Sequence, residues 1–110
     1  MDGTLVDTEP YWMAAEGPLV ESFGGVWTPE QALSLVGLGL EDSARILQNA
    51  GVRMQTREII DHLTETVSGQ LRRGGTPFRP GAREMLSGLR EAGIKTALVT
   101  MSMRSMADIV

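Results

Sequence analysis

The chain has 110 residues, 42% of them hydrophobic, and a formal net charge of −4. That length and composition suit one small domain, and the acidic balance argues against a nucleic-acid partner. There is no cysteine, which excludes disulfides and thiolate chemistry, and no apolar run is long enough to cross a bilayer. We therefore expect a cytoplasmic protein that binds neither membranes nor nucleic acids, while its oligomeric state stays open.

The chain begins with an acidic turn that contains a glycine, Met1-Asp2-Gly3-Thr4-Leu5-Val6-Asp7. A helix is predicted next over residues 8–23, because Thr8 is a capping residue and Pro10 fits a first helical turn. Gly17-Pro18 is expected to kink or break this helix, since proline removes a backbone donor and clashes with the preceding turn.

Three further helices are predicted between the first helix and a linker that begins at residue 74. One begins at Thr28 and runs to about residue 36, and the flexible stretch Gly37-Leu38-Gly39-Leu40 separates it from another at 41–50. The strongest covers residues 56–72, where apolar residues recur at helical spacing. The members of this stripe are Ile59, Ile60, Leu63, Val67 and Leu71.

The last third of the chain carries helix and strand signals in turn. A linker rich in glycine and proline at 74–81 precedes a predicted helix over residues 82–92. The apolar run at 94–99 is predicted to form a short buried strand of a parallel sheet. Another helix is predicted to begin at Arg104.

The opening turn resembles the first motif of the haloacid dehalogenase-like (HAD) hydrolases, Asp-x-Asp-Gly-Thr-(Leu/Val)-x-Asp, with Met1 in the place of x. The order of elements also resembles that of the family's β-phosphoglucomutase-like and phosphatase members. In both, the motif is followed by a block of helices, a linker and a helix–strand unit. The resemblance implies an α/β fold, with a partial Rossmann-like core from residues 1–11 and 77–110 and an α-helical cap inserted at 12–76. Because the motif's first aspartate would lie directly before Met1, it also implies an N-terminal fragment of a longer enzyme.

The resemblance assigns roles to the residues of the opening turn. Asp2 matches the aspartate that acts as general acid and base, protonating the leaving group and then activating water. Its backbone carbonyl would be one ligand of a Mg²⁺ cofactor, while Gly3 permits the turn and Thr4 fixes it. On its own, Asp-Gly-Thr is an ordinary surface turn, and only the longer string with its helical insertion favours the catalytic interpretation.

A second candidate element follows the predicted strand. Leu98-Val99-Thr100-Met101-Ser102 resembles the family's second motif, in which a Ser or Thr donates to a phosphoryl oxygen. Thr100 would take that catalytic role with help from Met101 and Ser102, and would share one cleft with Asp2 beneath the cap. The other interpretation is that Thr100 or Ser102 only caps the helix that follows.

Residues 37–43 resemble a cap loop that contacts substrate in the β-phosphoglucomutase-like subgroup, which makes Gly37, Leu40 and Asp42 candidate substrate residues. In the sugar phosphomutases this loop has an arginine that binds a distal phosphate, and Leu40 occupies the aligned position. Because an apolar side chain cannot pair with phosphate, we expect a phosphatase that acts on a small phosphorylated metabolite rather than a sugar phosphomutase.

The resemblance also implies catalytic parts that these 110 residues do not contain: the nucleophilic aspartate, a lysine, and an acidic pair for the metal. Lys95 cannot replace the lysine, because strand geometry places it about 16 Å from Thr100. We therefore expect part of a Mg²⁺-dependent hydrolase that works through an aspartyl-phosphate, inactive on its own. The alternative is a non-catalytic helical interaction module derived from such an enzyme.

Overall fold

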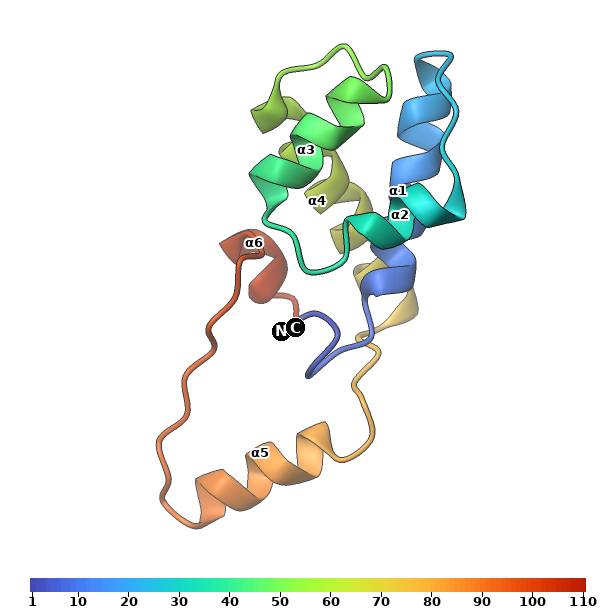
Figure 1. The fold of residues 1–110 in the computed structure, drawn as a ribbon. Helices are drawn as coiled ribbons and strands as arrows, with labels where there is room; N and C mark the ends of the chain where they lie inside the picture. Colours follow the sequence, from blue (N-terminus) through green and yellow to red (C-terminus); the bar gives the residue numbers. More distant parts are fainter.

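The computed structural model describes residues 1–110, which form an elongated molecule of 52 × 23 × 21 Å (Figure 1). All of its regular secondary structure is helical. The helices are α1 (Glu9–Ser22), α2 (Pro29–Ser34), α3 (Leu40–Asn49), α4 (Thr56–Gly74), α5 (Ala82–Glu91) and α6 (Arg104–Ala107). No helix combines the length and the apolar character that crossing a bilayer requires.

Helix α1 continues through Gly17-Pro18, so the sequence expectation of a break is wrong, while a kink at this point stays a prediction. Pro18 lies inside the helix and is exposed, and so is Ala14, whose carbonyl loses its donor because of the proline. That carbonyl can bond to water instead, which removes most of the cost of the missing hydrogen bond. Thr8 occupies the N-cap position, but its side chain makes no capping hydrogen bond.

The other cap-and-proline signal is confirmed at α2. The Thr28 side chain accepts from the Gln31 amide at 3.2 Å, and the Gln31 side chain accepts from the Thr28 amide at 2.8 Å. This reciprocal pair satisfies two amides that the first helical turn leaves without partners. Helices α3 and α4 also begin within a residue of their predicted starts.

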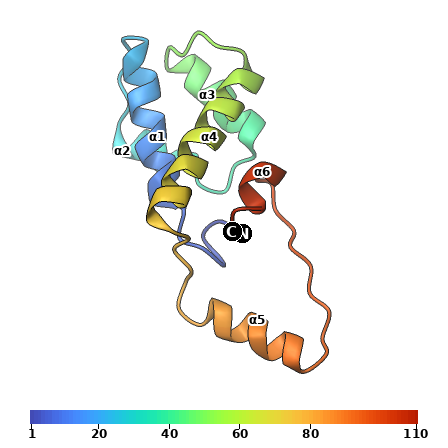
Figure 2. The same ribbon diagram turned by 180° about the vertical axis from the view of Figure 1, so that it is seen from behind.

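The core lies between α1, α3 and α4, and α4 also contacts α6 (Figure 2). The stripe predicted on α4 is buried, with Ile59 and Val67 both 0% exposed. Met106 of α6 is 0% exposed and belongs to the same cluster, so the end of the chain packs against the helical block. Both views place the two termini side by side, which brings the opening turn next to α6.

The predicted strand at 94–99 is wrong. These residues form an irregular segment between α5 and α6, and the amides of residues 95–99 donate no backbone hydrogen bond. The β-type pairings present are two isolated bridges, Asp2 with Val6 and Val6 with Phe78. Extended backbone needs a neighbouring strand to bond its amides and carbonyls, and none lies beside this segment. The Rossmann-like core is therefore not visible in the structure, and the assignment of 1–11, 77–110 and 12–76 to core and cap stays a prediction.

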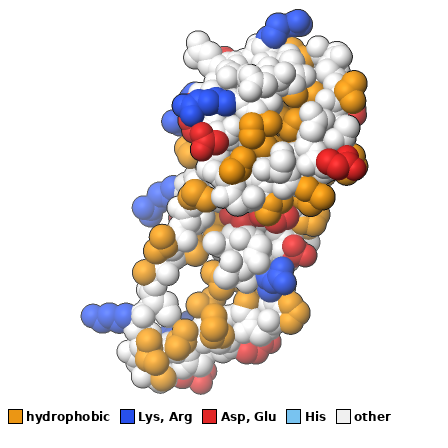
Figure 3. All heavy atoms as spheres, in the orientation of Figure 1, with side chains coloured by type: hydrophobic (Ala, Val, Ile, Leu, Met, Phe, Trp, Pro, Cys, Tyr) orange, Lys and Arg blue, Asp and Glu red, His pale blue; other side chains and the backbone are white.

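Helix α5 lies away from the core at one end of the molecule. Ala82 is its only buried residue, and Met85 is 53% exposed. Hydrophobic side chains gather on the surface around α5 in the lower part of Figure 3. Leu98 and Val99, in the segment after α5, are 48% and 86% exposed.

Candidate functional site

Backbone hydrogen bonds to the Met1 carbonyl hold the opening turn together. The oxygen of Met1 accepts from the amides of Thr4 and Leu5 at 3.2 and 2.9 Å, and the Gly3 amide donates to Val6 at 2.8 Å. Gly3 has a φ of 69°, a conformation that glycine adopts without strain. The turn is anchored to the linker before α5, where the Asp7 amide donates to Pro77 at 2.9 Å. Gly3 and Thr4 are exposed and line no cavity, and the Thr4 side chain makes no hydrogen bond that would fix the turn.

Asp2 projects from this turn and accepts hydrogen bonds from three side chains. Ser102 Oγ donates to Asp2 Oδ2 at 2.6 Å, while Thr8 Oγ1 and Trp12 Nε1 donate to Oδ1 at 2.5 and 3.3 Å. Partial burial works to raise the pKa of Asp2, but the bonds from Ser102, Thr8 and Trp12 outweigh it and leave the pKa below its ordinary value. Asp2 is therefore held as an ionised acceptor.

The bond between Ser102 and Asp2 joins residues that lie 100 positions apart. Ser102 is oriented by its neighbour, since its amide donates to Thr100 Oγ1 at 3.1 Å. Thr100 itself makes no hydrogen bond to Asp2, although both line one cavity. The structure thus brings Asp2 and residues 100–102 together, and Ser102 makes the direct contact.

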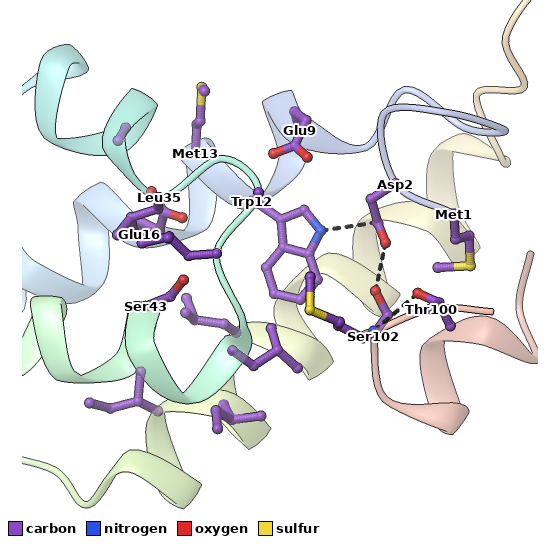
Figure 4. Close-up of a pocket in the computed structure, with 18 of the residues that line it drawn as sticks. Met1, Asp2, Glu9, Trp12, Met13, Glu16, Leu35, Ser43, Thr100 and Ser102 are labelled. Carbon is purple, nitrogen blue, oxygen red and sulfur yellow. Dashed lines mark hydrogen bonds between the residues drawn. The ribbon is translucent and has the colours of Figure 1, made fainter.

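This cavity has a volume of about 360 Å³ and lies between the opening turn, helices α1 to α4 and the loop before α6 (Figure 4). Asp2, Thr100 and Ser102 form one polar end, and Trp12 stands in the middle with its indole pointing at Asp2. Most of the remaining wall is apolar, and no lysine, arginine or histidine contributes to it. A partly enclosed apolar cavity with a few convergent polar groups is the usual form of a small-molecule site.

The candidate cap residues divide into two groups. Gly37 and Leu40 line the cavity, and Gly37 has a φ of 83° that its lack of a side chain allows. Asp42 does not line it, because its carboxylate faces solvent and pairs with Arg45 at 3.1 Å.

Two acidic residues of the cavity wall were missed from the sequence. Glu9 and Glu16 both line the cavity from α1, and Glu16 is only 5% exposed. Burial raises the pKa of Glu16 to about 7, the charge of Glu9 adds to this effect, and the Trp27 indole opposes it. Burial also raises the pKa of Glu9, as do the charges of Asp2 and Asp7. Glu9 and Glu16 lie seven residues apart, so helical periodicity places them on the same face of α1 as Trp12. This spacing is the feature of the sequence that could have predicted that the two glutamates lie close to Trp12.

The chain does not hold a complete metal site. No group of three or more His, Cys, Asp or Glu side chains is placed to bind an ion. Mg²⁺ prefers six oxygen ligands, whereas the Asp2 carboxylate is already bonded to three donors, and the role of the Asp2 backbone carbonyl as a ligand stays a prediction.

Comparison with known proteins shows which family this turn and helical block belong to. The chain matches the haloacid dehalogenase-like hydrolases over residues 1–109, and it belongs to this family.

Two curated proteins are similar to most or all of this chain. A protein of Thermotoga maritima named as a phosphorylated carbohydrates phosphatase is 28% identical over 103 residues, which are 91% of this chain and 46% of the relative. An uncharacterised protein of Lacticaseibacillus casei is 28% identical over 110 residues, 100% of this chain and 51% of the relative. The chain spans about half the length of these curated relatives.

A solved structure supports the same fold. A Thermotoga maritima protein assigned as a β-phosphoglucomutase matches with a TM-score of 0.61 and 25% identity, over 86% of this chain and 44% of that one. The helical arrangement described above is thus that of a HAD-like protein.

Proposed function

We propose that this chain carries the cap and the acid/base carboxylate of a Mg²⁺-dependent phosphatase that acts on a small phosphate monoester through an aspartyl-phosphate. The observation that carries the proposal is the bond between Ser102 and Asp2 at the polar end of the cavity. Family membership supports the hydrolase, and the named Thermotoga maritima phosphatase supports a phosphorylated substrate. The Mg²⁺ requirement is taken from the family.

The roles proposed for the individual residues follow from their contacts. Asp2 is ionised at neutral pH, so it is ready to accept a proton from water, and it can return a proton to a leaving group once it has taken one up. The hydroxyls of Thr100 and Ser102 and the amide of Met101 are the donors for phosphoryl oxygens. Ser102 would exchange its bond to Asp2 for one to the substrate.

The cavity wall favours a phosphatase over a phosphomutase. A phosphomutase must hold a second phosphate, and phosphate recognition uses arginine or lysine. Leu40 and the other wall residues offer no such group, while Glu16, which lies away from Asp2 in the cavity, would repel a second anion when it is ionised (Figure 4). We therefore propose a substrate with a single phosphate.

The 110-residue chain itself is not expected to turn over phosphate esters, because it contains neither the nucleophilic aspartate nor the lysine that the family uses. The test is p-nitrophenyl phosphate hydrolysis with Mg²⁺, by this chain and by a chain extended to the length of its relatives with an aspartate directly before Met1. We expect activity only in the extended chain, and Asp2→Asn should reduce its kcat by about 10²-fold or more. Near-full activity of the Asn variant would remove Asp2 from the acid/base role, and an inactive extended chain would favour a non-catalytic module.

A further inference from the structure

Trp12 has the largest side chain that lines the cavity, and its ring stands in the middle of it (Figure 4). The indole Nε1 atom donates to Asp2 Oδ1 at 3.3 Å, and this bond fixes the orientation of the ring. The side chain is half-buried, which leaves part of the ring free to contact a ligand. Because Asp2 and Ser102 form the polar end, a group attached to a phosphate held there would lie beside the indole.

Three methionine side chains share the cavity with this ring. Met1, Met13 and Met101 come from the start of the chain, from α1 and from the loop before α6. A thioether is flexible and polarisable, and contacts between sulfur and an aromatic ring are favourable. A tryptophan ring accompanied by three methionines therefore suits a flat aromatic group.

Outside its polar end, the cavity offers few partners for hydroxyl groups. None of the residues that line it is an Asn, Gln, Tyr, His, Lys or Arg, and Ser43 supplies the one hydroxyl away from Asp2. Glu9 lies near Asp2, whose charge raises the pKa of Glu9. Glu16 is 5% exposed and its Oε2 atom is buried, so it presents little to a ligand. A sugar hydroxyl that loses water without gaining a partner costs free energy, so this wall favours an apolar group over a carbohydrate.

We propose that the cavity takes an aromatic monophosphate, with the ring against Trp12 and the three methionines and the phosphate at the Asp2 end. The ring would be joined to the phosphate directly or through one carbon, because the indole is bonded to Asp2 itself. This substrate class differs from the carbohydrates in the name of the Thermotoga maritima relative. The inference rests on the proposed function for the position of the phosphate, whereas the ring subsite rests on Trp12 and the methionines alone.

The test uses four ligands: benzyl phosphate, cyclohexylmethyl phosphate, glucose 6-phosphate and benzyl alcohol. Each is titrated into the 110-residue chain, and the indole N–H signals of Trp12 and Trp27 are followed by NMR. Trp27 does not line this cavity, so its signal is an internal control. Benzyl phosphate is expected to bind about three- to tenfold more tightly than cyclohexylmethyl phosphate, the gain that aromatic geometry adds to buried area. It should bind about tenfold or more tightly than glucose 6-phosphate, whose hydroxyls would lack partners.

Two substitutions at Trp12 separate the aromatic contact from the bond to Asp2. Trp12→Phe loses the bond but keeps a ring, and should keep the preference for benzyl over cyclohexylmethyl phosphate. Trp12→Leu loses both and should abolish that preference. Circular dichroism of each variant establishes that the helices are intact.

A substitution at an exposed methionine tests the same contact without disturbing the core. Met101 is 66% exposed, and Met101→Ala should weaken the binding of benzyl phosphate by about two- to tenfold, the value of a contact between sulfur and a ring. Met85→Ala is the matched control, because Met85 is also exposed but lies on α5 outside the cavity. It should leave the binding unchanged.

The outcomes distinguish this inference from the proposed function. Equal binding of benzyl and cyclohexylmethyl phosphates, binding of glucose 6-phosphate as tight as that of benzyl phosphate, or no response of the Trp12 indole overturns the aromatic site. The phosphatase proposal would still stand if the extended chain hydrolyses p-nitrophenyl phosphate. If benzyl alcohol binds as tightly as benzyl phosphate, the ring subsite holds and the phosphate site fails.

Discussion

Asp2 is the residue on which the candidate site depends, and its state is set by three neutral donors rather than by a cation. Burial alone would favour the protonated acid, yet Ser102, Thr8 and Trp12 all bond to the carboxylate and favour the charged form. Because the pKa of Asp2 in the folded chain lies below its value in the unfolded chain, Asp2 stabilises the fold above about pH 4. That contribution is lost as the pH falls through the folded pKa.

Ser102→Ala should therefore raise the pKa of Asp2, since burial remains and the strongest opposing bond is removed. Carbon-detected NMR of the Asp2 carboxyl during an acid titration measures the shift. Ser105→Ala, an exposed position in α6, is the matched control and should leave the titration of Asp2 as it is. An identical curve for Ser102→Ala would mean that the bond does not form in solution.

The pKa of Glu16 is shifted in the opposite direction to that of Asp2. Burial raises the pKa of Glu16 from 4.5 to about 7, so ionisation favours the unfolded chain and stability falls as the pH rises from about 4.5 to about 7. Glu16→Gln is neutral throughout and should raise the free energy of unfolding at about pH 8 by up to about 3 kcal/mol. Urea unfolding at about pH 4 and about pH 8 measures this, with Glu21→Gln as the control. A difference between Glu16→Gln and the parent chain of the same size at both pH values would show that ionisation is not its cause.

At the level of helices and loops, Gly25 marks the closest approach between two segments. A Cβ at this position would lie 2.5 Å from the Ala50 carbonyl and 2.8 Å from Val20 Cγ1. The loop after α1 and the end of α3 therefore pack with no room for a side chain. The Gly25 amide also donates to the Val20 carbonyl at 3.1 Å, which fixes the loop in place.

Gly25→Ala is expected to lower the free energy of unfolding by about 1–3 kcal/mol, because the backbone atoms that it meets cannot move without disturbing α3. Gly69→Ala is the matched control. Its Cβ would meet only the flexible end of the Arg73 side chain, at 3.2 Å, and alanine in a helix interior should stabilise by about 0.5–1 kcal/mol. Thermal and urea unfolding of both variants measure the two changes in the free energy of unfolding. Changes of the same sign and size would contradict the prediction.

The helices could be predicted from local signals, whereas elements that depend on distant partners could not. Thr28 with Pro29 and the stripe on α4 encode their helices within a few residues of sequence. Residues 94–99 carry an equally clear strand pattern, but a strand also needs a neighbour, and the pattern cannot supply one.

The sequence predicted the candidate site only in part. The motif pointed to Asp2 and to residues 100–102, and the structure places them together. It gave no indication that Thr8 and Trp12 would bond to Asp2 or that Glu16 would be buried. An isolated glutamate in a helix normally faces solvent, so only the packing of α1 against its neighbours reveals its position.

Over the whole molecule, stability is distributed unevenly. The cluster of buried residues joins α1, α3, α4 and α6, while α5 contributes only Ala82 to the interior. An isolated helix of ten residues is marginal in water, so α5 depends on packing that it lacks here.

Hydrogen exchange should reflect this difference. Amides in the middle of α4 are expected to exchange only through opening of the core, and those of α5 within about tenfold of unprotected rates. Mass spectrometry or NMR after transfer into deuterated water resolves the two helices. Equal protection in α4 and α5 would show that α5 is held by contacts other than those in this arrangement.

The segment at 94–99 has a consequence for the behaviour of the chain at high concentration. Its amides are unbonded over residues 95–99, and Val99 presents most of its side chain to water. Such a segment is a template for strand pairing between molecules, and Lys95 is the only charge within it to discourage stacking. Self-association through this stretch should therefore grow steeply with concentration, and a charged residue in place of Val99 should extend the range over which the purified chain stays monodisperse.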